Sequence, residues 1–239
     1  MHELHDPLTG ACSRVTMLDE IEKAISCADA THPDTILLYL NINGFRNVND
    51  KFGHETGDRL LVEVARRLES VCPNGHLLGR VSGDEFILLL RHARRHDPLH
   101  PVLNRVERCM SQPFMLGDLE IAISASIGCV VIADRNTTPS ELMHRGEMAM
   151  SLVKRGERKG VCLADDQIIR EIESARLIDR KIQHAVKHHG FFLHFQPTVG
   201  LQDGTVTGAE ALLRLTDEDG YIFNASEFMA AITRTQYGD

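Results

Sequence analysis

Two acidic residues stand side by side between apolar runs in the segment RVSGDEFILLL, residues 80–90. Asp84 and Glu85 follow the small pair Ser82 and Gly83. Adjacent carboxylates repel one another at a tight turn unless a cation or hydrogen-bond donors neutralise them. Hard oxygen ligands suit Mg²⁺, so a divalent metal is one partner for this pair. The other interpretation is a solvated hairpin turn, because Asp and Gly are common turn formers.

Other polar groups occur where they could meet these acids. The apolar run TILLYL ends in residues 41–43, Asn-Ile-Asn, and ligands tend to lie at strand ends. Lys154 and Arg158 are four residues apart, which predicts that they share one face of a helix. Two cations on one face suit a polyphosphate, although cations are also favoured at a helix C-terminus for electrostatic reasons alone.

Hydrophobic patterning predicts the elements that position these groups. Residues 35–42 form a continuous apolar run, which is typical of a strand buried on both faces. Residues 76–90 predict a β-hairpin with the acids at its tip. Residues 114–132 predict two strands with a turn at Gly117-Asp118. Helices are predicted at residues 44–52, 55–71, 101–110 and 138–156.

These elements predict an α/β domain over residues 1–164, followed by a linker helix over residues 165–189. Residues 190–239 predict a strand, a turn at Asp203-Gly204, a second strand and a short helix. We expect this last segment to be too small for an independent domain with a normal core.

Composition excludes several classes of protein. The net charge of -8 over 239 residues argues against a broad nucleic-acid-binding surface. No apolar run approaches the roughly 18 residues that span a bilayer, and the N-terminus does not resemble a secretory signal. The six cysteines are far apart without a CxxC pair, which indicates neither a zinc site nor a disulfide framework. We therefore expect a cytoplasmic protein without a membrane segment.

Five separated motifs together resemble the GGDEF family, which comprises diguanylate cyclases and their degenerate relatives. They are LTGACSR, NINGFRNVNDKFGHETGD, SGDEF, SASIG and KRGER, and they span about residues 5–164. A further pair, FQPTV and GAEALLR, resembles the opening of an EAL domain, the phosphodiesterase that often accompanies a GGDEF domain. The resemblance implies an α/β (α+β) nucleotide-cyclase-like fold with a central, mostly antiparallel sheet flanked by helices. A linker helix and an incomplete TIM-barrel-like EAL fragment, residues 190–239, would follow.

The resemblance also implies an activity. In such cyclases two GTP molecules, one per protomer of a homodimer, react to give cyclic di-GMP and pyrophosphate with Mg²⁺ (or Mn²⁺) as cofactor. A complete EAL barrel takes about 250 residues. Although Glu210 occupies a metal-ligand position of that family, we expect no phosphodiesterase activity from this chain.

The resemblance assigns roles to the residues at the hairpin tip and the neighbouring strand. Asp84 is expected to bind metal, and Glu85 to bind metal or to help deprotonate the attacking hydroxyl. Ile42 would offer its backbone carbonyl to the metal, beside Asn41 at another metal position. Gly83 would allow the backbone to approach the phosphates closely.

The remaining expected contacts are with the nucleotide. Asn49 and Asp58 would hydrogen-bond the guanine edge, while Lys154 and Arg158 would hold the terminal phosphates. Asn49 as a helix-turn residue and Asp58 as a first-turn helix acid are the structural alternatives.

The sequence departs from the family pattern in three places. The product-binding motif RxxD before the hairpin is absent, since Pro73 and His76 stand there, so product inhibition at that site is not expected. Ser82 replaces the leading glycine, which is tolerated if its φ is negative. Asn41 replaces a metal-binding Asp, and Asn43 replaces an acid often found nearby. An amide oxygen brings no charge, so we expect weaker metal binding and a weakened cyclase. The alternatives are a catalytically inactive GTP-binding regulatory module of a GGDEF–EAL protein, and a non-catalytic protein that docks on a partner through its EAL fragment.

Overall fold

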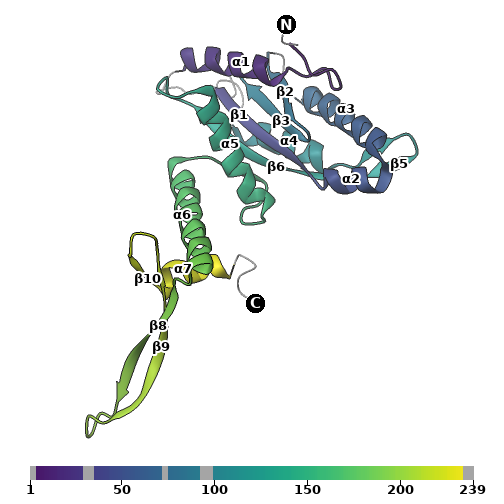
Figure 1. Ribbon diagram of the computed structural model, residues 1–239. Coiled ribbons are helices and arrows are strands. Elements are labelled where there is room, and N and C mark those ends of the chain that lie inside the picture. Colours follow the sequence, from purple (N-terminus) through teal and green to yellow (C-terminus); the bar gives the residue numbers. More distant parts are fainter. Residues whose placement is uncertain (1–3, 29–34, 72–74, 92–98, 234–239) are drawn as a thin grey trace. The chain divides into compact units, whose positions relative to one another are not determined.

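The computed structural model describes residues 4–28, 35–71, 75–91 and 99–233 of the chain. The chain divides into two compact units, residues 1–169 and residues 170–239. Figure 1 labels most of the helices and strands of the two units, which are described separately below.

Helices and strands alternate along the first unit. Its elements are α1 (Arg14–Ser26), β1 (Thr35–Asn43), α2 (Phe45–Phe52), α3 (His54–Val71), β2 (Leu77–Ser82), β3 (Glu85–Leu90), α4 (Leu99–Ser111), β4 (Phe114–Leu116), β5 (Leu119–Ile121), β6 (Ser124–Ile132), α5 (Pro139–Lys154) and β7 (Val161–Leu163). Five strands form one sheet in the order β2-β3-β1-β6-β7. All neighbours in it are antiparallel except β6 and β7. This mostly antiparallel sheet with flanking helices confirms the predicted fold class.

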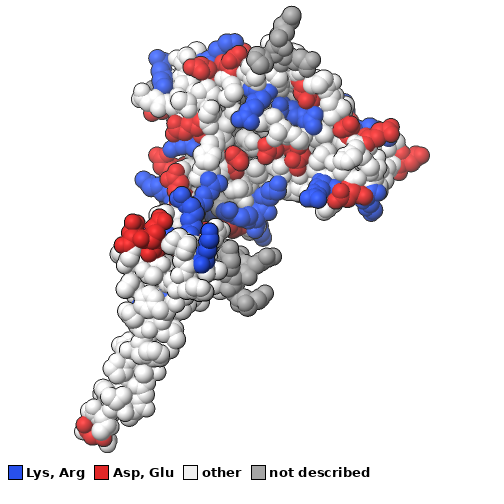
Figure 2. Space-filling model, viewed as in Figure 1, with Lys and Arg blue, Asp and Glu red and all other residues white. Residues whose placement is uncertain are grey.

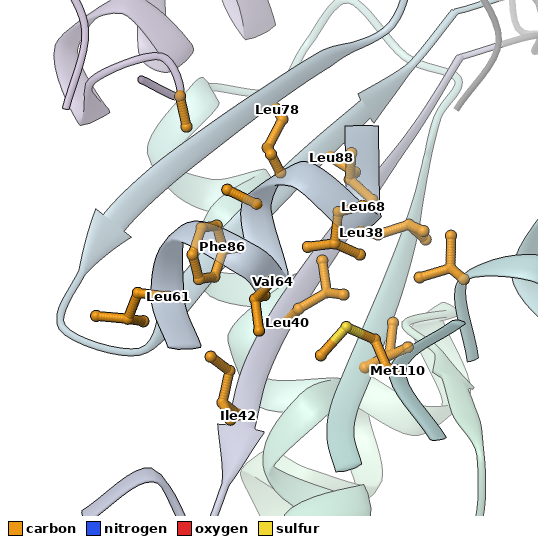
Figure 3. Packing of buried hydrophobic residues seen from close by; sticks show 14 of the residues in the cluster. Leu38, Leu40, Ile42, Leu61, Val64, Leu68, Leu78, Phe86, Leu88 and Met110 are labelled. Atoms are coloured by element: carbon orange, nitrogen blue, oxygen red, sulfur yellow. The ribbon is translucent and has the colours of Figure 1, made fainter. Parts of the chain in front are cut away.

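The central strand β1 is buried along nearly its whole length, as its continuous apolar run predicts. On one face of the sheet, alternate residues from Ile36 to Ile42 join a core cluster with apolar residues of β3 and α3. Figure 3 shows Leu61, Val64 and Leu68 of α3 facing Leu38, Leu40 and Phe86 of the sheet. The apolar stripe of α3 therefore fixes this helix against the sheet.

On the other face of the sheet, α5 packs so closely on β1 and β6 that its backbone approaches the sheet with little side-chain volume between them. A Cβ atom at Gly128 of β6 would come within 2.0 Å of the Gly146 carbonyl oxygen and 2.7 Å of the Met150 nitrogen. A Cβ atom at Gly146 of α5 would lie 3.0 Å from the Cβ of Tyr39. Glycines on both elements thus permit the close approach that brings the end of α5 to β1.

Residues 114–132 contain three strands rather than the predicted two. β4 and β5 form a separate two-stranded hairpin that turns at Gly117-Asp118, where Gly117 has φ +71°. β6 begins at Ser124 and pairs along its length with β1. The two-strand prediction is wrong because the apolar pattern runs across the break after Ile121 without a turn-forming residue.

The second unit contains the greater part of α6 (Asp166–His188) and an open three-stranded sheet in the order β10-β9-β8. The strands are β8 (Phe191–Val199), β9 (Val206–Thr216) and β10 (Ile222–Asn224), and α7 (Ala225–Ile232) follows them. A small core forms around Ile182, Ala185, Leu215 and Phe228. The described residues of this unit form no closed barrel.

The β8–β9 ribbon is almost uncharged on the face visible in Figure 2, apart from acidic atoms at its tip. The ribbon exposes about half or more of the surface of four large apolar residues, Leu193, Phe195, Val199 and Val206. Neither α6 nor any other described helix has the length and apolar character that a membrane span requires.

We expect Gly128→Ala to destabilise the first unit by about 1–3 kcal/mol, because an overpacked core must move a helix or a strand. Urea unfolding measured by circular dichroism would report the loss. The matched control is Gly208→Ala in β9, where the nearest atom, the Thr198 hydroxyl oxygen, would be 3.4 Å away. Equal stability of Gly128→Ala and the wild type would show that α5 does not pack this closely.

Candidate functional site

The hairpin tip between β2 and β3 is held by an arginine on its own first strand. The register of the two strands shifts between Arg80 and Ser82, and Gly83 adopts φ +43°. The Arg80 guanidinium donates to the Gly83 carbonyl from Nε at 2.9 Å and from Nη2 at 2.8 Å. It also pairs with Asp6 at 3.1 Å, and both side chains are largely buried. The turn is therefore tied to the N-terminal segment as well as to β2.

Two hydroxyl groups hold the carboxylate of Glu85. The Tyr39 hydroxyl and the Ser82 hydroxyl each donate to Oε2 of Glu85 at 2.9 Å. Burial raises the pKa of Tyr39, and the neighbouring Glu85 charge raises it further, so the phenol stays protonated and donates. His189 is the only described non-glycine residue with positive φ, so Ser82 has a negative φ, the condition under which serine is tolerated at this position.

Asn41 lies directly opposite Glu85 in the register of β1 and β3. Its side chain is 3% exposed. The amide oxygen Oδ1 accepts a hydrogen bond of 2.8 Å from Nζ of Lys154, the last residue of α5. A neutral amide and a lysine therefore occupy the position beside the two acids.

Lys154 and Arg158 do not share a helix face, and that prediction is wrong. α5 ends at Lys154, and Gly156 follows with φ +76°. The Gly156 amide donates to the Val153 carbonyl, and the Glu157 amide donates to the Leu152 carbonyl, both at 3.0 Å. This pair of hydrogen bonds is a Schellman motif, which terminates the helix before Arg158. Arg158 instead lies exposed in the loop that leads to β7.

Asp84 is joined to β1 through its backbone. The Ile42 amide donates to the Asp84 carbonyl at 3.1 Å. Because the N–H and C=O of one strand residue point to the same neighbour, the Ile42 carbonyl is directed towards the hairpin tip. The hairpin tip and the adjacent end of β1 thus carry carboxylate, carbonyl and amide oxygens, and these are the ligands that Mg²⁺ and Mn²⁺ prefer.

The charge of this group of donors is low. Among the residues that the structure describes, no three His, Cys, Asp or Glu side chains lie close enough to hold a metal ion together. Asp84 and Glu85 are the two carboxylates of the tip, and Asn41 contributes an oxygen without charge. The set of donors fits a hard divalent ion, with fewer charges than three carboxylates would supply.

Asn43, the last residue of β1, is hydrogen-bonded to serines of β6 rather than to the acidic tip. Its amide nitrogen donates to the Ser124 hydroxyl at 2.9 Å, and its amide oxygen accepts from the Ser126 hydroxyl at 2.8 Å. The nitrogen and the oxygen of the Asn43 carboxamide thus both form hydrogen bonds that link β1 to β6.

The predicted base-binding residues lie on the two helices that follow β1. Asn49 is on α2, and Asp58 is exposed in the first part of α3. Oδ1 of Asn49 is buried and has no hydrogen-bond partner among the described residues. It lies so close to Gly57 that a Cβ atom there would come within 1.9 Å of it. Asn49 is thus packed against the backbone just before Asp58.

The structure brings together Asn41, Ile42, Asp84, Glu85 and Lys154. Three residues that hold this group were not predicted from the sequence, namely Tyr39, Arg80 and Asp6. Strand alternation could have indicated Tyr39, because residues 39 and 41 share one face of β1. Nothing in the local sequence indicates that Arg80 pairs with Asp6, since 74 positions separate them.

Comparison with known families gives two matches. The family profile described as "Diguanylate cyclase, GGDEF domain" matches residues 3–160, and the EAL domain profile matches residues 179–239.

Among curated proteins, the bifunctional diguanylate cyclase/cyclic di-GMP phosphodiesterase MucR of Pseudomonas aeruginosa is 31% identical over 232 residues. This alignment covers 97% of the chain and 34% of MucR. The signaling protein YkoW of Bacillus subtilis is 30% identical over 245 residues, covering 97% of the chain and 29% of YkoW. The chain thus spans about a third of the length of these relatives.

Solved structures match the first unit. A shortened form of TpbB (YfiN) from Pseudomonas aeruginosa, comprising only the GGDEF domain, gives a TM-score of 0.63 at 29% identity. The match covers 71% of this chain and 99% of that chain. Diguanylate cyclase SiaD from the same organism, solved with its activator SiaC, gives a TM-score of 0.61 at 32% identity over 67% of this chain and 62% of SiaD.

The contact between Asp6 and Arg80 predicts a dependence of stability on pH. Burial alone would raise the pKa of Asp6, but hydrogen bonds from Thr9 and Arg80 outweigh it and lower the pKa. Since the folded pKa is depressed, this stabilisation is complete above the ordinary Asp value of about 4 and is lost as pH falls through the lower folded value. Asp6→Asn should therefore be less stable than wild type at pH 6, with a difference that shrinks below about pH 4.

Urea unfolding at pH 6 and at pH 3 would measure both differences. Asp50→Asn is the control, because Asp50 pairs only loosely with Arg46 at 3.8 Å on an exposed surface. A difference for Asp6→Asn that stays constant between the two pH values would contradict the assignment.

Proposed function

The chain belongs to the GGDEF domain family of diguanylate cyclases, and on that premise we propose that its first unit is a GTP site of the cyclase type with a weakened metal site. One observation carries the proposal. Asn41, a neutral residue, is buried opposite Glu85 at a position where an acid would complete the metal ligands. The proposed reaction joins two GTP molecules into cyclic di-GMP and releases pyrophosphate.

The hairpin tip would supply the catalytic groups. Asp84 and Glu85, with the Ile42 carbonyl and the Asn41 amide oxygen, would hold Mg²⁺ or Mn²⁺. The bound ion would offset the negative charge of the phosphates and polarise the α-phosphate. Glu85 would be kept in place by the hydroxyls of Tyr39 and Ser82, where it can accept the proton of the attacking 3′-hydroxyl.

The nucleotide would be held from two directions. Lys154 and Arg158 would bind the terminal phosphates, and the glycine at position 83 would leave the backbone open to them. Asn49 and Asp58 would bind the guanine base. Because each GTP must meet a second one, the active form would be a homodimer with one nucleotide per protomer. The presence of GTP in the cytoplasm makes that compartment the proposed location.

A second candidate function is a GTP-binding regulatory module without turnover. A specific contact favours it: Lys154 donates to Asn41 at 2.8 Å, so a phosphate must compete for that ammonium group. The match of residues 179–239 to the EAL domain fits either function within cyclic di-GMP signalling. In the regulatory case, nucleotide bound to the first unit would act on an EAL domain, with Glu210 at a metal-ligand position of that domain.

We expect Asn41→Asp to raise the initial rate of cyclic di-GMP formation at limiting Mg²⁺ by about tenfold or more, since it restores a charged metal ligand. Even changes outside the ligand shell alter metal-site affinity or activity about 10–100-fold. Chromatography of the products after incubation with GTP and Mg²⁺ measures the rate.

Asn43→Asp is the matched control, because Asn43 is engaged with Ser124 and Ser126 and should give no gain. Asp84→Asn should abolish any activity. Product from neither wild type nor Asn41→Asp, with GTP still bound, would select the regulatory function. Absence of GTP binding by both proteins would refute the proposal.

A further inference from the structure

Gly57 is a buried glycine inside a helix, and its backbone does not require glycine. It lies in α3, and its φ is outside the left-handed region. Its amide continues the helical hydrogen bonding by donating to the Gly53 carbonyl at 3.2 Å. Glycine is among the least favourable residues in a helix, so a reason other than conformation is needed for its presence.

Space for Asn49 supplies that reason. A Cβ atom at position 57 would lie 1.9 Å from Oδ1 of Asn49, 3.0 Å from its Cγ and 3.3 Å from Cζ of Phe45. A Cβ atom essentially never lies within 3.0 Å of another non-bonded heavy atom, so any side chain at position 57 must displace the carboxamide of Asn49. Asn49 is flexible enough to move, and the fold itself should therefore accept alanine.

The position of Asn49 is not explained by stability. Its Oδ1 is buried without a partner among the described residues, and a buried unpaired acceptor is unfavourable. Buried polar groups without a partner are rare in folded proteins, and a role in binding or catalysis is one of the reasons for which they occur. With the oxygen turned towards Gly57, the amide nitrogen is directed elsewhere and remains available as a donor.

We infer that Gly57 is a positioning residue that sets the orientation of Asn49 and couples it to Asp58. The inference rests on the proposed function, in which Asn49 and Asp58 bind guanine. Because Asn49 packs on the backbone directly before Asp58, one glycine fixes both groups relative to each other. A side chain at position 57 separates them and weakens selection of guanine over adenine, without loss of the folded state.

The test is calorimetric titration of the whole chain with GTP and with ATP, in the presence of Mg²⁺. Gly57→Ala should weaken GTP binding about tenfold, which corresponds to the loss of one good hydrogen bond, and should reduce the preference for GTP over ATP. Its melting temperature should equal or exceed that of wild type. The matched control is Val62→Ala, which raises helix propensity at an exposed position of the same helix. It should leave GTP affinity unchanged.

A double-mutant cycle tests whether Gly57 acts through Asn49. Asn49→Ala should weaken GTP binding, and Gly57→Ala should add no further loss in that background. Affinity of Gly57→Ala within twofold of wild type would overturn the inference, as would losses that simply add.

A readout without nucleotide keeps this inference separate from the proposed function. In ¹⁵N-correlated spectra, the side-chain amide signals of Asn49 are those that Asn49→Ala removes. Gly57→Ala should shift them, and Val62→Ala should not. If wild type does not bind GTP, the proposed function fails. In that case unmoved Asn49 signals in Gly57→Ala would overturn the positioning role, and shifted ones would support it.

Discussion

Antiparallel pairing between β1 and β3 sets the position of every polar group at the hairpin tip. The register places Asn41 opposite Glu85 and Leu40 opposite Phe86. Because side chains alternate along a strand, this pairing sends Leu40 and Phe86 into the core and turns Asn41 and Glu85 to the other face. A shift of one residue would exchange the two sets and bury the acid in the core. The site is therefore specified by the same apolar pattern that stabilises the sheet.

The helices extend this constraint in two directions. On the face that carries Asn41 and Glu85, the paired glycines of β6 and α5 allow the helix to lie close, so that Lys154 reaches Asn41. On the opposite face, the apolar stripe of α3 fixes the helix that carries Gly57 and Asp58. The groups that we propose to bind phosphate and base are thus carried by elements that pack on opposite faces of one central strand. The hydroxyls of Tyr39 and Ser82 complete the arrangement by donating hydrogen bonds to the carboxylate of Glu85.

Much of this could be predicted from the sequence because the informative patterns are local. The buried strand, the hairpin with acids at its tip and the apolar stripe of α3 follow from periodicity over a few residues. Contacts between distant segments could not be predicted in this way, since Tyr39 meets Glu85 and Lys154 meets Asn41 only after the sheet order is set. The helix face assigned to Arg158 was wrong for a local reason: the glycine at position 156 ends α5 through a Schellman motif, and spacing alone does not reveal that stop.

A crystal structure of the chain with Mg²⁺ and a GTP analogue that has an unreactive α,β-bridge would show whether the hairpin tip holds the metal and the nucleotide. We expect the ion between the Asp84 carboxylate and the Ile42 carbonyl, with Lys154 moved from Asn41 to the phosphates. We also expect the guanine beside Asn49 and Asp58. A nucleotide bound elsewhere, or a Lys154 side chain still bonded to Asn41 with the phosphates in place, would refute the proposed site.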